Sequence, residues 1–157
     1  MRNENQDTVA TITSHSPAET FAHGRALGES LRAGDVIALD GDLGAGKTHF
    51  VKGIAAGLGC EGDVTSPTFT LVHEYAGGRL ALFHFDFYRL ESEDETLRIG
   101  LDDYLGAGGV MVIEWAGKFP ALLPAATRWF HLRAGTGSAK GDGDVRFIEE
   151  SGEALRA

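Results

Sequence analysis

The chain has 157 residues, 43% of them hydrophobic and 24% charged, which is ordinary for one globular domain. Its 23 acidic and 14 basic residues give a formal net charge of -9, which disfavours direct, unaided binding of RNA or DNA. The single cysteine excludes an internal disulfide, and neither a signal-peptide core nor a run of about 18 apolar residues occurs. These features indicate a cytoplasmic protein without a membrane span.

The first third of the chain predicts alternating strands and helices. Residues 1–8 are polar and expected to fray. Ser16, Pro17 and Glu19 form a helix start, because a capping hydroxyl precedes a proline and an acid. Gly34 ends this helix, and Gly59 ends the next one. The expected elements are a strand over 9–12, a helix from 17 to Gly34, a strand over 36–39 and a helix over 47–58.

The remainder predicts a mixed sheet. Gly77-Gly78 separates two strand-like runs, and Ser92 with Glu95 repeats the capping pattern before a helical region that Gly100 interrupts. The expected elements are strands over 71–75 and 79–85, helix from 92 to about 105, and strands over 110–113, 128–133 and 145–149. A mobile glycine-rich loop is expected over 134–144. We therefore predict a single α/β domain over 1–157, a P-loop NTPase-like three-layer sandwich with a mixed, centrally parallel sheet.

A glycine-rich octet joins the strand over 36–39 to the helix that follows. It matches G-x-x-x-x-G-K-[ST] in the strand-loop-helix context that phosphate binding requires, whereas a simple glycine-rich turn does not need that context. Its N–H groups are expected to point at phosphate oxygens beside the positive end of the helix dipole. Lys47 would reach the β- and γ-phosphates, and the Thr48 hydroxyl would bind Mg²⁺. The expected nucleotide-binding residues are Gly41, Asp42, Leu43, Gly44, Ala45, Gly46, Lys47 and Thr48.

Two acids stand at strand ends where ligands of open α/β sheets gather. Glu114 follows the apolar run VMVI, and Asp86 follows LALFHF. Either carboxylate could serve phosphate-bound Mg²⁺ or orient the attacking water, and either could instead cap a turn. The candidate catalytic residues are Lys47, Asp86 and Glu114.

The segment Ser66, Pro67, Thr68, Phe69 and Thr70 could be a switch loop ordered by the γ-phosphate, or a proline turn before a strand. Trp115 could cover the nucleotide or belong to the core. The six histidines, including His84, show no metal-ligand spacing and are interpreted as structural or solvated.

The absence of two sequence features limits which nucleotide and which type of reaction we expect. No N-K-x-D segment for reading guanine is present, so ATP is the expected nucleotide. A small-molecule kinase would need a second anion site, and Arg89 and Arg98 are the only arginines between Arg79 and Arg128. A kinase, or a nucleotide-binding interaction module without significant turnover, remains an alternative.

Five segments together make the chain resemble the TsaE (YjeE-like) family, the P-loop ATPases of bacterial tRNA threonylcarbamoyladenosine synthesis. They are GDLGAGKT at 41–48, SPTFTLV at 66–72, HFDFYRL at 84–90, the stretch from Glu95 to Tyr104, and Glu114-Trp115. The resemblance runs from about residue 16 to residue 116.

The resemblance implies a role for each candidate. Thr48 and Glu114 would be Mg²⁺ ligands, Asp86 a second acid needed for hydrolysis, and Trp115 a residue near the nucleotide. Residues 65–70 would be a switch loop, and residues 16–21 would lie near the adenine. TsaB-like and TsaD-like proteins would be the partners, so the acidic chain would not need to hold tRNA itself.

Overall fold

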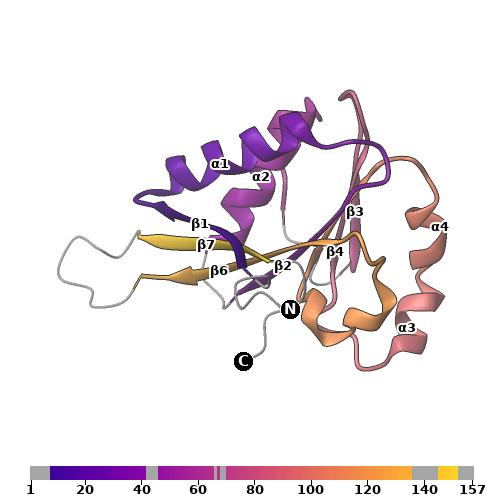
Figure 1. Ribbon diagram of the computed structural model, residues 1–157. Coiled ribbons are helices and arrows are strands. Elements are labelled where there is room, and N and C mark those ends of the chain that lie inside the picture. Colours follow the sequence, from indigo (N-terminus) through magenta and orange to yellow (C-terminus); the bar gives the residue numbers. More distant parts are fainter. Residues whose placement is uncertain (1–7, 42–45, 66, 68–69, 136–144, 152–157) are drawn as a thin grey trace, which may run out of the picture.

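The computed structural model describes residues 8–41, 46–65, 67, 70–135 and 145–151. Figure 1 shows α1 and α2 on one side of a twisted sheet and α3 and α4 on the other. The strands are β1 Thr8–Ser14, β2 Val36–Gly41, β3 Val72–Tyr75, β4 Leu82–Asp86, β5 Val110–Glu114, β6 Arg128–Ala134 and β7 Arg146–Ser151. The helices are α1 Pro17–Ser30, α2 Lys47–Leu58, α3 Glu93–Arg98 and α4 Leu101–Leu105, with short 3-10 turns η1 Ala116–Lys118 and η2 Pro120–Leu122.

The seven strands form one sheet in the order β1-β7-β6-β2-β5-β4-β3. The central neighbours β6, β2, β5 and β4 are parallel, whereas β1, β7 and β3 pair antiparallel at the two edges. This arrangement confirms the predicted mixed, centrally parallel sheet. Ligands of such sheets gather beyond the carboxyl ends of the parallel strands, which here are the ends of β2, β4 and β5.

The helix α1 begins as its sequence predicts. The Ser16 side chain accepts the N–H of Glu19, and Pro17 occupies the first helical position. The Glu19 carboxylate accepts the N–H of His15 at 2.9 Å, one residue earlier than in a reciprocal capping box.

Several strands begin or end at other residues than expected. Thr8, expected to fray, is the first residue of β1, and Ala134, expected in the loop, is the last residue of β6. Strand β3 begins at Val72 because Leu71 has a φ of 74°, which an extended strand cannot contain. Strand β4 begins at Leu82, since the N–H of Arg79 donates instead to the Leu58 carbonyl at the end of α2. Residues 136–144 of the expected mobile loop lie outside the described residues.

Capping chemistry accounts for the two short helices. Ser92 and Glu95 make the predicted reciprocal capping box at the start of α3. Gly100, with a φ of 86°, separates α3 from α4.

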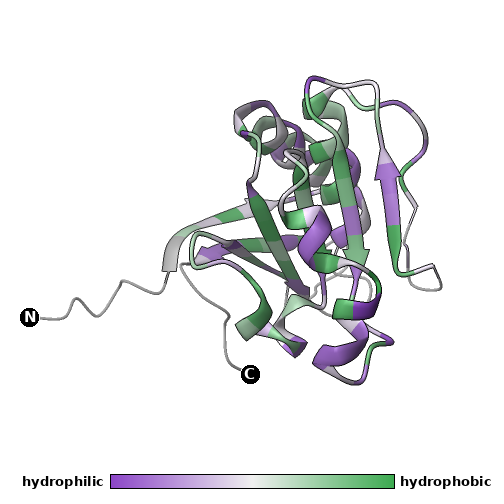
Figure 2. Ribbon diagram, turned by 90° about the vertical axis from the view of Figure 1, so that its right-hand side faces the viewer, coloured by the Kyte–Doolittle hydropathy of each residue, from purple (hydrophilic) through white to green (hydrophobic). Residues whose placement is uncertain are grey.

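The sheet separates two apolar layers, and Figure 2 shows its central strands as mainly hydrophobic. One layer packs α1 and α2 on the sheet, and the other packs α3, α4, η1 and η2 on the opposite face. Strand β4 shows the division, because Leu82 belongs to the first layer while Phe83 and Phe85 belong to the second. Within the described part of the chain, no helix is long and apolar enough to cross a membrane.

Candidate functional site

The glycines at the two described edges of the glycine-rich loop, Gly41 and Gly46, have a backbone conformation that favours glycine. Gly41 and Gly46 have φ values of 153° and 94°, a region that residues with a side chain rarely adopt. Any Cβ on Gly41 would also overlap the Leu132 carbonyl. Asp42, Leu43, Gly44 and Ala45, expected to bind phosphate, lie outside the described residues.

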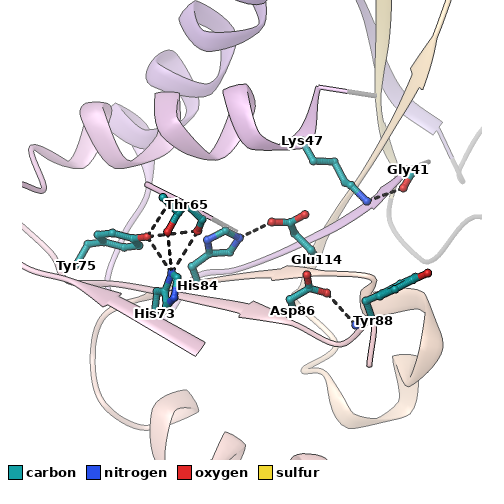
Figure 3. A network of polar contacts seen from close by, with 9 residues as sticks. All are labelled: Gly41, Lys47, Thr65, His73, Tyr75, His84, Asp86, Tyr88 and Glu114. Carbon is teal, nitrogen blue, oxygen red and sulfur yellow. Dashed lines mark hydrogen bonds and ion pairs between the residues drawn. The ribbon is translucent and has the colours of Figure 1, made fainter. Parts of the chain in front are cut away.

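Lys47 is the first residue of α2 and is almost fully buried, with 6% of its surface exposed. Its Nζ donates to the Gly41 carbonyl at 2.6 Å, across the mouth of the octet (Figure 3). It also lies 4.3 Å from the centre of the Trp115 ring, a cation–π distance. Thr48 follows on the exposed side of the first helical turn. The lysine predicted to hold phosphate is thus placed at the loop.

Asp86 and Glu114 are brought together by strand pairing. They are register partners at the ends of the parallel strands β4 and β5, and Glu114 is also paired with Leu39, two residues before Gly41. Both carboxylates are buried, with 2% and 5% of each residue exposed. Strand alternation puts them on the face that α1 and α2 cover, because Leu82 and Val112 belong to that layer.

Each of the two carboxylates accepts a hydrogen bond from a neighbour (Figure 3). Asp86 Oδ1 accepts the N–H of Tyr88 at 2.8 Å, so Asp86 does cap the turn after β4. Glu114 Oε2 lies 2.6 Å from His84 Nε2, and both of these side chains are buried. The turn-capping interpretation is therefore correct for one oxygen of Asp86.

Trp115 stands directly beside the octet. Its φ of 58° turns the chain sharply after β5, and its N–H donates to the Leu39 carbonyl at 3.0 Å. Its ring packs on Tyr88 at 4.9 Å between centroids and lies under Lys47. The indole thus touches the lysine predicted to bind phosphate, and it also packs against residues of the second apolar layer.

The expected switch segment is held at both described ends. Before it, Tyr75 Oη accepts the N–H of Thr65 at 3.2 Å, and His73 Nδ1 lies 3.2 Å from the Thr65 carbonyl. After it, Leu71 donates to the Pro67 carbonyl at 2.6 Å and accepts from the N–H of Asp86 at 3.1 Å. Pro67 is buried and Thr70 exposed, while Ser66, Thr68 and Phe69 lie outside the described residues.

Three residues near the site were missed from the sequence. His84 was interpreted as structural or solvated, yet it contacts Glu114, and its H-x-D spacing to Asp86 was the available signal. Asp40, whose Oδ1 accepts the Gly117 N–H at 3.1 Å, ties the end of β2 to η1. Arg146 lies beside Gly46, and a Cβ on this glycine would be 3.6 Å from its Cγ. No local sequence pattern could predict that Arg146 lies beside Gly46, because β7 is far from Gly46 in the sequence.

Comparisons with known proteins identify the family to which the chain belongs. The family model described as threonylcarbamoyl adenosine biosynthesis protein TsaE matches residues 14–140. A Bacillus subtilis protein named tRNA threonylcarbamoyladenosine biosynthesis protein TsaE is 49% identical over 109 residues, covering 69% of this chain and 68% of its own. A Treponema pallidum protein of the same name is 45% identical over 120 residues, covering 76% of this chain and 88% of its own.

A solved structure gives the same result at the level of the fold. The crystal structure of Bacillus subtilis YdiB superimposes with a TM-score of 0.71 at 34% identity, over 90% of this chain and 84% of that one. The match extends beyond the shared octet to most of the sheet and its helices, so it confirms the predicted fold. The chain belongs to the TsaE family.

Proposed function

We propose that this chain hydrolyses ATP with Mg²⁺, as the ATPase component of the machinery that makes threonylcarbamoyladenosine in tRNA. The observation that carries the proposal is the meeting of buried Lys47, Asp86 and Glu114 at one end of the parallel strands, directly after β2. A positive group beside two carboxylates suits an anion that arrives with a divalent cation. Family membership favours hydrolysis over transfer of phosphate to a small molecule.

The donor set fits Mg²⁺ bound together with a nucleotide. Mg²⁺ prefers oxygen ligands and is commonly held by one or two carboxylates, substrate phosphates and water. Asp86 and Glu114 supply carboxylates, and Thr48 supplies a hydroxyl on the exposed side of α2. No group of three or more metal-binding side chains occurs among the described residues, which suits a cation that the nucleotide brings rather than a permanent metal centre.

Each residue of the site has a defined task in this proposal. Lys47 exchanges the Gly41 carbonyl for phosphate oxygens and neutralises their charge. Thr48 and Glu114 would hold Mg²⁺, which would supply positive charge against the phosphates when it is bound. Asp86, fixed by the Tyr88 N–H, orients the attacking water. Trp115 covers the lysine and limits access of bulk water to the phosphates.

We infer the direction in which the nucleotide would lie from the order of the strands. Strands β5 and β4, which carry the acids, lie on one side of β2, whereas β6 and β7 lie on the other. The γ-phosphate and Mg²⁺ therefore belong on the β5 side. Arg146 on β7 and the Thr20 methyl of α1 flank Gly46 on the opposite side, where the ribose and adenine would extend. Arg146 is thus not placed as an arginine finger for the γ-phosphate.

The negative net charge of the chain supports a role that depends on partners in a cytoplasmic tRNA-modifying assembly. A net charge of -9 is unsuited to holding tRNA, so TsaB-like and TsaD-like proteins would carry the tRNA and the transfer chemistry. ATP turnover on this chain would change its conformation and reset those partners between rounds.

The test is Lys47→Ala. Removing the ammonium is expected to lower ATP turnover about 100- to 1000-fold, as for other groups that stabilise transition-state charge. Turnover is measured as phosphate release with purified partners, and tRNA nucleosides are analysed in cells carrying only the variant. Normal phosphate release by a folded Lys47→Ala protein would refute the proposal. Lys52→Ala, on the exposed face of the same helix, is the control.

A further inference from the structure

The pairing of His84 with Glu114 is more than a packing contact. His84 lies in the apolar run Leu82–Phe85 of β4, where its side chain is 1% exposed. Its register partner on β5 is Val112, so Glu114 stands two residues further along the neighbouring strand on the same face. The imidazole and the carboxylate therefore meet diagonally across the sheet at 2.6 Å, as Figure 3 shows.

The hydrogen bond fixes which nitrogen carries the proton. An ionised carboxylate only accepts, so His84 Nε2 must donate to Glu114 Oε2. His84 Nδ1 is buried and finds no hydrogen-bond partner in the described part of the chain. The contact with Glu114 thus requires a hydrogen on Nε2.

Packing alone gives no reason for a histidine at this position. An apolar residue would fill the layer without burying an unpaired nitrogen, as Leu82 does two residues earlier on the same face. What the imidazole adds is one directed donor. That donor holds one oxygen of Glu114, while no described residue donates to the other oxygen, Oε1.

We propose that His84 is a positioning residue, which holds Glu114 Oε2 by its Nε2–H so that Oε1 faces the Mg²⁺-nucleotide in a fixed orientation. The inference rests on the proposed ATPase function and adds a residue to it. Donors that orient a ligating carboxylate in this way typically contribute about 10- to 100-fold to metal affinity or activity.

Two substitutions separate positioning from packing. The amide nitrogen of His84→Gln reaches the place of Nε2 and can still donate to Glu114, whereas that of His84→Asn reaches only the place of Nδ1. We expect His84→Asn to raise the Mg²⁺ concentration that half-saturates Mg²⁺-dependent binding of a fluorescent ADP analogue, and to lower ATP turnover, each by about 10- to 100-fold. His84→Gln should recover most of both losses. His23→Asn on α1 is the control, and thermal unfolding monitors the fold of each variant.

A double-mutant cycle with Glu114→Gln completes the test. If His84 acts through the carboxylate, His84→Asn should add little once Glu114→Gln is present. Equal losses in His84→Asn and His84→Gln, an unchanged Mg²⁺ requirement in His84→Asn, or full additivity in the cycle would each overturn the role of His84. These results would leave the ATPase proposal standing, whereas failure of the unaltered chain to bind nucleotide with Mg²⁺ would overturn both.

Discussion

At the scale of single residues, the site combines structural and chemical roles in the same side chains. One oxygen of Asp86 holds the turn at Tyr88, and one oxygen of Glu114 is held by His84. Amide substitutions keep an oxygen that can accept these bonds but remove the negative charge. They therefore test the chemistry with little change to the fold.

Glu114→Gln and Asp86→Asn should each lower phosphate release by about 100-fold, because the lost charge serves Mg²⁺ or the attacking water in the transition state. Nucleotide affinity should fall much less. Single-turnover phosphate release and binding titrations measure the two effects separately. The control is Glu74→Gln, because the Glu74 carboxylate accepts from the Tyr104 hydroxyl away from the site. This variant should release phosphate at the wild-type rate. Wild-type turnover of either site variant with partners present would return that residue to a purely structural role.

For Asp40 we predict an effect on the stability of the fold rather than on ATP turnover. Burial raises the pKa of Asp40, and the Gly117 N–H and nearby His131 and Lys47 oppose that rise without cancelling it. The Asp40 carboxyl therefore stays protonated to a higher pH in the folded state than in the unfolded chain. The free energy of unfolding consequently falls as the pH rises from the unfolded pKa of Asp40 through its folded pKa. Asp40→Asn should remove this loss, because the amide oxygen still accepts from Gly117.

Denaturant unfolding at pH 4 and pH 7 checks this expectation. The variant should gain stability over wild type at pH 7 and less at pH 4. Asp35→Asn, at the start of the same strand, tests whether any acid near β2 has the effect. A destabilised Asp40→Asn protein at pH 7 would show that the ionised carboxylate stabilises the fold instead.

At the scale of elements, close contact between α1 and α2 sets the position of the glycine-rich octet. Gly24 and Gly28 of α1 face Gly53 and Gly57 of α2, and a Cβ on any of the four would overlap backbone atoms of the other helix. Four glycines at a spacing of four thus let two helix backbones touch. Because Lys47 begins α2, this contact fixes the position of the helix that carries the lysine predicted to bind phosphate.

Gly53→Ala should therefore destabilise the fold by about 1–3 kcal/mol or more, although alanine is a better helix former. Its methyl group would overlap the Phe21 carbonyl, which is backbone and cannot rotate away. Chemical denaturation measures the loss. Gly106→Ala is the control, since its Cβ would approach nothing closer than 3.9 Å, and it should be near neutral. Equal stability of the two variants would show that the helices separate without cost.

At the scale of the whole molecule, the chain carries the two acids and the lysine predicted to bind phosphate, and Arg89 follows Asp86 by three residues in the exposed turn after β4. Arg146 approaches from the opposite edge of the sheet. We expect neither arginine to reach the γ-phosphate in the isolated chain, so the charge that develops there during hydrolysis would be poorly stabilised. An outside partner can complete the site.

The isolated chain should therefore bind ATP with Mg²⁺ and hydrolyse it slowly, and a TsaB-like and TsaD-like pair should accelerate phosphate release. Docking is expected to order residues 66–70 against the nucleotide, so Thr68→Ala should reduce the acceleration more than the basal rate. Phosphate release is measured for the chain alone, with partners, and with partners and the variant. Full activity in isolation, unchanged by partners, would favour an independent NTPase or a kinase.

The sequence by itself determined the local elements, and it predicted the residues of a phosphate-binding site. Helix starts at Ser16 and Ser92, the helix end at Gly59 and the octet that contains Lys47 depend on contacts within a few residues, so local patterns indicate them directly. The sequence also supplied both strand-end acids and the family, because these are carried by short, ordered motifs.

Only the tertiary structure decided what depends on pairing between distant segments. The sheet register placed Glu114 against Asp86 and, on the adjacent strand, His84 against Glu114 across 30 residues of sequence. The approach of β7 brought Arg146 to Gly46, which lies 100 positions earlier in the chain, and the left-handed backbone at Leu71 shortened β3. Long-range register is set by the packing of both faces of the sheet together, and no local sequence window contains that information.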